Sequence, residues 1–163
     1  MRRHVLILGA DGFIGRHIAF AARRAGWQVT AHARNPAALR HMGFDTLRAD
    51  LNDPVTHDPA FWRPVLAEGA HVINAAGLLT GSAAAMHAVH VAAPAAVYAA
   101  LHPGARGVLI SAIGVEADTP FARHRRDGET AAPEAVTVLR PGLVVGHTSY
   151  GGSSLARALA ALP

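Results

Sequence analysis

The chain has 163 residues, enough for one globular domain with a core, and 51% of them are apolar. Its formal net charge of +4 comes from arginines that are scattered along the sequence and concentrated only at 123–126. We therefore expect a solvated surface and no nucleic-acid partner. Nucleic-acid binding is an alternative that rests on the net charge alone. The absence of cysteine excludes disulfides, thiolate metal sites and cysteine nucleophiles.

The first predicted element is a short apolar strand, His4–Leu8, which leads into a glycine-rich turn and a helix expected over 13–25. Gly9 lets the chain turn sharply, Gly12 lets the backbone approach a phosphate, and Gly15 lets the helix pack close to the strand. The helix N-terminus then offers free N–H groups to an anion. A strand before and a helix after the turn favour a dinucleotide pyrophosphate site over a merely structural glycine turn. The expected site residues are Gly9, Asp11, Gly12, Phe13, Ile14 and Gly15.

Strand-like and helix-like segments alternate along the rest of the chain, which predicts helical crossovers and a parallel sheet. The further strands are expected at 28–32, 46–48, 71–74, 107–111 and 136–139, and the further helices at 36–41, 59–67, 84–101 and 121–131. The fold class is therefore α/β, a Rossmann-like doubly wound parallel sheet in three αβα layers. We expect one NAD(P)-binding domain over residues 1–163.

The glycine spacing, together with Phe13-Ile14, resembles the extended and atypical branches of the short-chain dehydrogenase/reductase superfamily, of the NAD-dependent epimerase/dehydratase type. Further landmarks of that family follow the predicted strands in order and cover nearly the whole chain: Asp50-Leu51, Asn74-Ala-Ala-Gly77, Ile110-Ser-Ala-Ile-Gly114 and Leu139-Arg-Pro-Gly142. The stretch 111–129 is similar to the NmrA-like proteins and to relatives of the complex I 39-kDa subunit. Members of the family usually continue with a substrate-binding portion, which this chain is expected to lack beyond a last helix starting at Ser153 or Ser154.

The resemblance implies places for the rest of a dinucleotide. Asp50 and Leu51 would flank the adenine, and the ribose would lie over Ala75, Ala76 and Gly77. The nicotinamide would be approached by Ser111, Pro141 and Gly142. Simpler alternatives are turn chemistry for Asp50 and a common strand-ending pair for Pro141-Gly142.

The end of the second strand indicates which cofactor is bound. An NAD-preferring site of this fold places a carboxylate there to bind the ribose diol, about 20 residues after the glycine turn. Here Ala33 stands at that position and Arg34 follows it. A guanidinium suits a 2′-phosphate, to which Arg16 could add charge, so NADP(H) is favoured over NAD(H). The alternative is that Arg34 only caps an exposed strand end.

The catalytic residues of the resembled superfamily are largely replaced. Its tyrosine donates the proton that the substrate oxygen needs, and a lysine four residues on lowers the pKa of that tyrosine. Phe121 and Arg125 stand at these two positions, and phenylalanine cannot donate a proton. The remaining candidates are Ser111 and His124, although His124 is more simply a solvated helix histidine. The two phenols of the chain, Tyr98 and Tyr150, lie out of register.

Two function classes follow from this pattern. The first is an NADP-dependent oxidoreductase, or an epimerase-like protein, acting on an unknown small substrate or quinone. The second is a non-catalytic NADP(H) redox sensor or an assembly module, favoured by the lost dyad. We expect a cytoplasmic protein, a possible homodimer, with no membrane segment within this chain. His87 and His90 share a predicted helix, but no further ligand stands beside them, so no metal site is expected.

Overall fold

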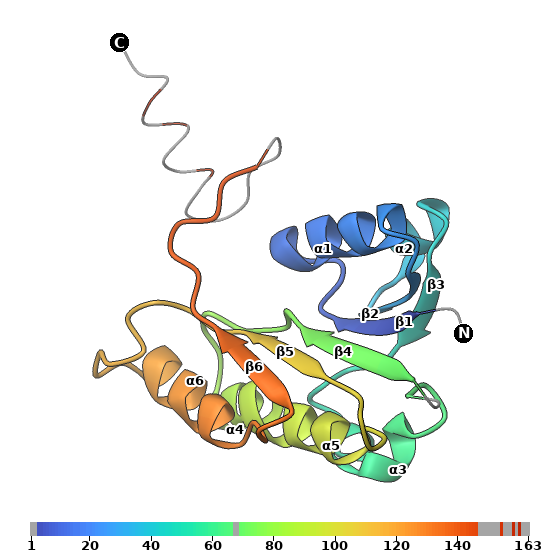
Figure 1. Cartoon of the computed structure of the whole chain (residues 1–163). Coiled ribbons are helices and arrows are strands. Elements are labelled where there is room, and N and C mark those ends of the chain that lie inside the picture. The colour runs from blue at the N-terminus through green and yellow to red at the C-terminus, as the bar shows by residue number, and fades with distance from the viewer. Residues whose placement is uncertain (1–2, 67–68, 147–153, 155–157, 159, 161–163) are drawn as a thin grey trace.

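Six parallel strands form one sheet in the order β3-β2-β1-β4-β5-β6 (Figure 1). The computed structural model describes residues 3–66, 69–146, 154, 158 and 160. The strands are β1 (His4–Leu8), β2 (Gln28–Ala33), β3 (Asp45–Arg48), β4 (Ala70–Asn74), β5 (Gly107–Ile110) and β6 (Val136–Leu139). The order reverses between β1 and β4, the place where open α/β sheets leave a ligand-binding crevice at their carboxyl edge.

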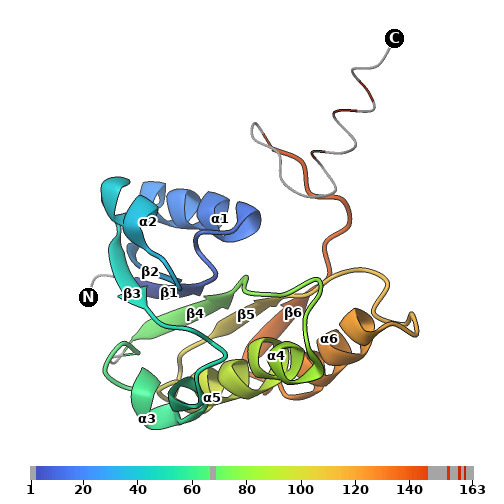
Figure 2. The ribbon, with the colours of Figure 1, turned by 180° about the vertical axis from the view of Figure 1, so that it is seen from behind.

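Helices cover both faces of the sheet, which confirms the three-layer αβα prediction. One face carries α1 (Phe13–Arg24) and α2 (Ala37–His41) over the first three strands (Figures 1 and 2). The other face carries α3 (Pro59–Trp62), α4 (Ala83–His87), α5 (Ala93–Ala99) and α6 (Pro120–Thr130). A 3-10 turn (Pro54–His57) precedes α3. Within the described ranges, no helix is long and apolar enough to cross a bilayer.

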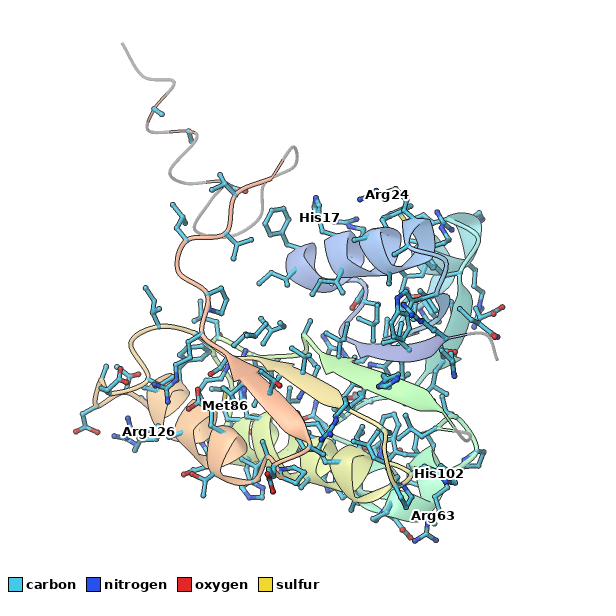
Figure 3. All side chains as sticks on the ribbon, viewed as in Figure 1. His17, Arg24, Arg63, Met86, His102 and Arg126 are labelled. Carbon is cyan, nitrogen blue, oxygen red and sulfur yellow. The ribbon has the colours of Figure 1, made fainter. Side chains whose placement is uncertain are left out.

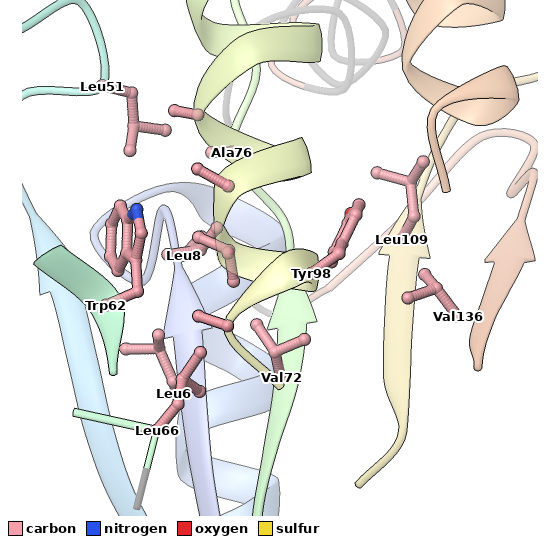
Figure 4. Packing of buried hydrophobic residues seen from close by; sticks show 14 of the residues in the cluster. Leu6, Leu8, Leu51, Trp62, Leu66, Val72, Ala76, Tyr98, Leu109 and Val136 are labelled. Atoms are coloured by element: carbon pink, nitrogen blue, oxygen red, sulfur yellow. The ribbon is translucent and has the colours of Figure 1, made fainter. Parts of the chain in front are cut away.

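Each face of the sheet has its own core. On the α3–α6 side, buried strand residues such as Leu6, Val72 and Leu109 pack against Trp62 and Tyr98 (Figure 4). The Trp62 ring is fully buried and its Nε1–H donates to the Thr56 carbonyl at 2.7 Å. On the α1 side, the alternate strand residues pack against that helix in a second cluster. Burial of each large aliphatic side chain contributes about 1.5–3 kcal/mol, so the strands that carry the site are held from both sides.

The expected long helix over 84–101 is wrong in one respect: it is interrupted by a π-helical turn, Ala88–Ala92. Pro94 has no N–H to donate to the His90 carbonyl, so the α-helical ladder cannot run through this point. The Ala93 N–H instead reaches back five residues to the Ala88 carbonyl. Sequence periodicity alone does not reveal this interruption, because it takes no account of the N–H donor that Pro94 lacks.

The expected helix over 59–67 is also too long. It ends at Trp62 because Pro64 follows two residues later and interrupts the ladder. Other boundaries move by a residue or so: β2 extends to Ala33 and β5 ends at Ile110. The helix expected from Ser153 or Ser154 falls almost wholly outside the described residues.

Gly128 lets α6 pack directly on the π turn. A Cβ added to Gly128 would lie 2.3 Å from the His90 carbonyl oxygen. We expect Gly128→Ala to lower the free energy of unfolding by about 2 kcal/mol, because a clash costing about 3 kcal/mol outweighs the gain of about 1 kcal/mol in helix propensity. Urea unfolding measures this effect. Gly81→Ala is the matched control, since its Cβ would make only ordinary contacts of 3.8 Å or more; equal stability of the two variants would contradict this packing.

Candidate functional site

The glycine turn after β1 packs so closely that side chains are excluded at two of its glycines. Gly9 has a positive φ of 69°, and a Cβ there would lie 2.8 Å from the Ala76 Cα. A Cβ on Gly15 would lie 2.2 Å from the Gly9 carbonyl oxygen. Gly12, the N-cap of α1, has an ordinary φ of −69° and no side-chain cap. The turn is therefore fixed between α1 and the loop that follows β4.

The start of α1 offers unpaired backbone donors. Within the described part of the chain, the N–H groups of Asp11, Phe13 and Ile14 make no backbone hydrogen bond, whereas the Gly12 N–H donates to the Gly9 carbonyl at 3.1 Å. First-turn amides and the positive end of the helix dipole suit an anion. This corner can hold a phosphate by main-chain contacts alone.

A cleft opens beside the turn, toward β2 and β3. It brings together most residues expected on the adenosine side of a dinucleotide, from four separate loops at the carboxyl edge. Its lining includes Gly9, Asp11, Gly12, Arg34, Asp50, Leu51, Ala75, Ala76 and Gly77. The turn residues Phe13, Ile14 and Gly15 are not in its lining, nor are Ser111, Pro141 and Gly142.

Arg34 stands exposed at the mouth of this cleft, directly after buried Ala33 at the end of β2. No ion pair with Arg34 is found in the described ranges. Across the cleft, Asp50 Oδ1 accepts hydrogen bonds from the Asn52 N–H and side-chain amide, both at 3.0 Å. These bonds hold the pKa of Asp50 below its usual value, with a smaller contribution from the Arg34 charge. Asp50 thus shapes a turn and lines the cleft at the same time.

His32 is a cleft residue that the sequence analysis missed. Its ring is 2% exposed, and its Nδ1 accepts a hydrogen bond from the Gly9 N–H at 3.3 Å. Burial lowers the pKa of His32 to about 4, although the Ala49 carbonyl and nearby carboxylates oppose this shift. The neutral His32 ring therefore stabilises the glycine turn by accepting the hydrogen bond from the Gly9 N–H. The sequence does indicate the direction of this side chain: His32 directly precedes Ala33 in β2, and successive strand residues point to opposite faces of the sheet.

On the other side of the turn, Ser111 is part of a chain of polar side chains. The Ser111 hydroxyl donates to Glu129 at 2.5 Å, and Glu129 receives both Nε and Nη2 of Arg140, at 3.0 and 2.5 Å. These bonds from Arg140, together with Ser111, lower the pKa of Glu129 despite its partial burial. Pro141 and Gly142 follow Arg140 directly, after β6. The hydroxyl proton of Ser111 is therefore engaged in a hydrogen bond to the Glu129 carboxylate.

The residues at the two dyad positions lie together on α6. The Arg125 guanidinium is 5.5 Å from the Phe121 ring centre, and its Nη1 donates to the Ile110 carbonyl at 3.1 Å. Phe121 also meets His90 edge-on at 5.9 Å. His124, expected to be solvated, is instead half-buried with an enclosed Nδ1 that has no partner.

Tyr98 and the histidines of the helical segment 83–99 lie apart from the dyad positions in sequence, and the structure gives their surroundings. Burial raises the pKa of Tyr98, whose hydroxyl accepts a hydrogen bond from Asn74 at 3.1 Å in the core. His87 is exposed and His90 is buried, so the two do not share a surface. In the described ranges no three His, Cys, Asp or Glu side chains gather as metal ligands. Tyr150 lies outside these ranges.

Comparison with known proteins gives one family match and many similar folds. The family model described as the NAD dependent epimerase/dehydratase family matches residues 5–104. A ceramide reductase of Caulobacter vibrioides is 31% identical over 153 residues, which cover 87% of this chain and 46% of that protein. The chain therefore spans about half the length of this curated relative.

Two solved structures illustrate the shared fold. A putative epimerase from Burkholderia cenocepacia superposes with a TM-score of 0.74 at 20% identity, over 98% of this chain and 60% of the other. A short-chain dehydrogenase/reductase superfamily protein from Agrobacterium tumefaciens, solved with bound NAD, gives 0.67 at 18% identity, over 85% and 48%. These likenesses confirm the Rossmann-like fold.

Proposed function

Because the chain belongs to the NAD-dependent epimerase/dehydratase family, we propose that it binds NADP(H) and acts as an oxidoreductase on a small carbonyl compound, alcohol or quinone. The observation that carries this proposal is the unpaired first turn of α1 beside a cleft lined at the ends of β1, β2, β3 and β4. Neighbours of the same fold are solved with a nicotinamide dinucleotide bound, which supports this class of cofactor.

The residues of this chain would divide the cofactor among three places. The amides of Asp11, Phe13 and Ile14 suit the pyrophosphate, and the cleft suits the adenosine. The nicotinamide half would then extend the other way, past Gly77 toward Ser111. When bound, the cofactor supplies or accepts the hydride, while the protein orients it and excludes water.

Arg34 is exposed at the cleft mouth and has no ion pair among the described residues, which supports our proposal that it meets the 2′-phosphate of NADP(H). A carboxylate at position 33 would repel that phosphate, and Ala33 removes the repulsion. A guanidinium can grip a phosphate with two parallel hydrogen bonds, which favours NADP(H) over NAD(H).

Arg34→Glu tests this preference. We expect NADPH affinity to fall by about tenfold or more, because a charge-assisted contact becomes repulsive, while NADH affinity changes by less than about threefold. Calorimetric titration of both cofactors measures the two affinities. Arg63→Glu is the control, since Arg63 is exposed directly after α3 and is not in the lining of the cleft (Figure 3). Equal losses for both cofactors, or no loss, would remove Arg34 from the site.

Two features favour a second function: Phe121 stands at the tyrosine position of the dyad, and the Ser111 hydroxyl donates its hydrogen bond to Glu129. A protein that binds NADP(H) without turnover would be a redox sensor or an assembly module. Consumption of NADPH followed with a panel of carbonyl compounds and quinones separates the two functions. Ceramides belong in the panel because one relative is called a ceramide reductase. Tight binding with no turnover of any compound would leave the sensor or module.

A further inference from the structure

The Arg125 guanidinium is a half-buried positive charge that hydrogen-bonds to no carboxylate in the described residues. In the described part of the chain its only hydrogen bond goes to the Ile110 carbonyl, and its Nε is enclosed with no acceptor. No described ion pair includes it. Burial lowers the pKa of Arg125 from the usual arginine value, but a guanidinium stays charged.

The carboxylate of Glu129 attracts this charge from a distance but makes no hydrogen bond or ion pair with it in the described residues. Glu129 lies one turn further along α6, but both of its oxygens are taken by Arg140, and Ser111 adds a third hydrogen bond. A desolvated charge is costly unless it is paired and hydrogen-bonded. Arg125 therefore has N–H donors that are not used within the described residues, and an anionic or strongly polar oxygen would stabilise its charge.

The position of Arg125 shows which oxygen could reach it. Its Nη2 lies 2.5 Å from where a Cβ on Gly77 would be, so the guanidinium rests on the loop after β4 while its Nη1 meets the end of β5. Both strand ends lie at the carboxyl edge of the sheet (Figure 1). This is the nicotinamide side of the glycine turn, opposite the side that leads to Arg34.

Exposed aliphatic side chains follow three strands at the carboxyl edge of the sheet. Leu79 follows β4, Ile113 follows β5, and Leu143 and Val145 follow β6; each is at least 65% exposed. The last two loops lie side by side, since the Ile113 N–H points to the Pro141 carbonyl at 3.4 Å. Exposed aliphatic groups on the loops that follow the same strand ends as this cation suit a ligand with a polar oxygen and a hydrocarbon body.

We propose that Arg125 receives the reacting oxygen of an apolar carbonyl substrate, whose hydrocarbon chain covers Leu79, Ile113, Leu143 and Val145. This inference rests on the proposed oxidoreductase function. The carbonyl carbon accepts the hydride supplied by the reduced cofactor, the C=O π pair moves onto the oxygen, and the resulting alkoxide takes a proton from water. Arg125 stabilises the developing negative charge on that oxygen, so no side-chain phenol is required.

A carboxylate with a short alkyl chain is a stable mimic of such an oxyanion. We expect octanoate to bind the protein–NADP⁺ complex, and butyrate to bind about tenfold or more weaker because it covers less aliphatic surface. Arg125→Met should weaken octanoate binding by about tenfold or more, and Arg125→Lys by less, while NADP⁺ affinity changes less than about threefold. Arg123→Met, an exposed neighbour on α6, should change neither affinity.

Calorimetry measures both affinities, and thermal unfolding shows whether each variant is folded. If Arg125→Met weakens NADP⁺ but not octanoate, the guanidinium holds the cofactor and the inference is overturned. Equal octanoate affinity in wild type, Arg125→Met and Arg125→Lys overturns it as well, as does butyrate binding as tightly as octanoate. Failure of the wild type to bind NADP⁺ would instead overturn the proposed function, so the two failures are distinguishable.

Discussion

Replacing Gly12 by alanine is expected to weaken NADPH binding by about tenfold or more while leaving the protein folded. Gly12 has extended backbone angles, φ −69° and ψ 168°, which alanine adopts readily. Among the described residues, an added Cβ would have one neighbour within 4 Å, the Gly9 carbonyl oxygen at 3.3 Å. The methyl group would otherwise project into the cleft, where a phosphate must approach the backbone. Calorimetric titration with NADPH measures the loss.

Thermal unfolding of the same variant separates binding from folding. We expect Gly12→Ala to cost at most about 1 kcal/mol of stability, since alanine is a poorer N-cap than glycine. Gly15→Ala is the contrasting control, because its Cβ would clash with the Gly9 carbonyl at 2.2 Å and so destabilise the whole turn. Unchanged NADPH affinity in a folded Gly12→Ala protein would show that the turn does not hold phosphates.

Acidification from pH 7 to pH 4 is expected to destabilise the protein strongly. Burial lowers the pKa of both His32 and His90 to about 4, and the Arg125 charge contributes to the shift at His90. In the unfolded chain both histidines titrate near 6.5, so between these values the unfolded state binds more protons. Stability therefore falls as the pH drops from about 6.5 to about 4, by up to about 3 kcal/mol for each histidine. Below about 4 this contribution is lost in full.

Urea unfolding at pH 7, 5.5 and 4.5 measures this dependence. His90→Gln should flatten the curve, because glutamine can keep the hydrogen bond from His90 Nε2 to the Leu78 carbonyl, 2.9 Å away, without titrating. His41→Gln, at an exposed position on α2, should leave the curve as in the wild type. A free energy of unfolding that stays constant between pH 7 and pH 4.5 would contradict the buried neutral state of both rings.

The parallel sheet, its three layers and the gathering of several site residues at one cleft could be predicted from the sequence. Short apolar runs separated by helical segments define a parallel sheet, and in such a sheet every strand ends at the same edge. Residues that directly follow strands, such as Gly9, Arg34 and Asp50, must therefore meet there. Their meeting depends on chain order and not on details of packing.

The remaining features depend on contacts between residues far apart in the sequence. The π turn reflects a proline at the second residue of α5 and a close approach by Gly128 from another helix. The engagement of Ser111 by Glu129, 18 residues away, and of Glu129 by Arg140 depends on how α6 packs on the ends of β5 and β6. Periodicity and motif spacing carry no information on such distances. For the same reason, the sequence shows only that Arg125 stands at the lysine position of the dyad, and not which groups it contacts.

The central claim is that the amides at the start of α1 bind the pyrophosphate of a dinucleotide. Titration of the ¹⁵N-labelled full chain with NADP⁺, followed by two-dimensional NMR, tests it residue by residue. We expect the amide signals of Asp11, Phe13 and Ile14 to shift most, together with those of the cleft around Arg34. Saturating shifts confined to other surfaces, or no shifts in a folded protein, would contradict it.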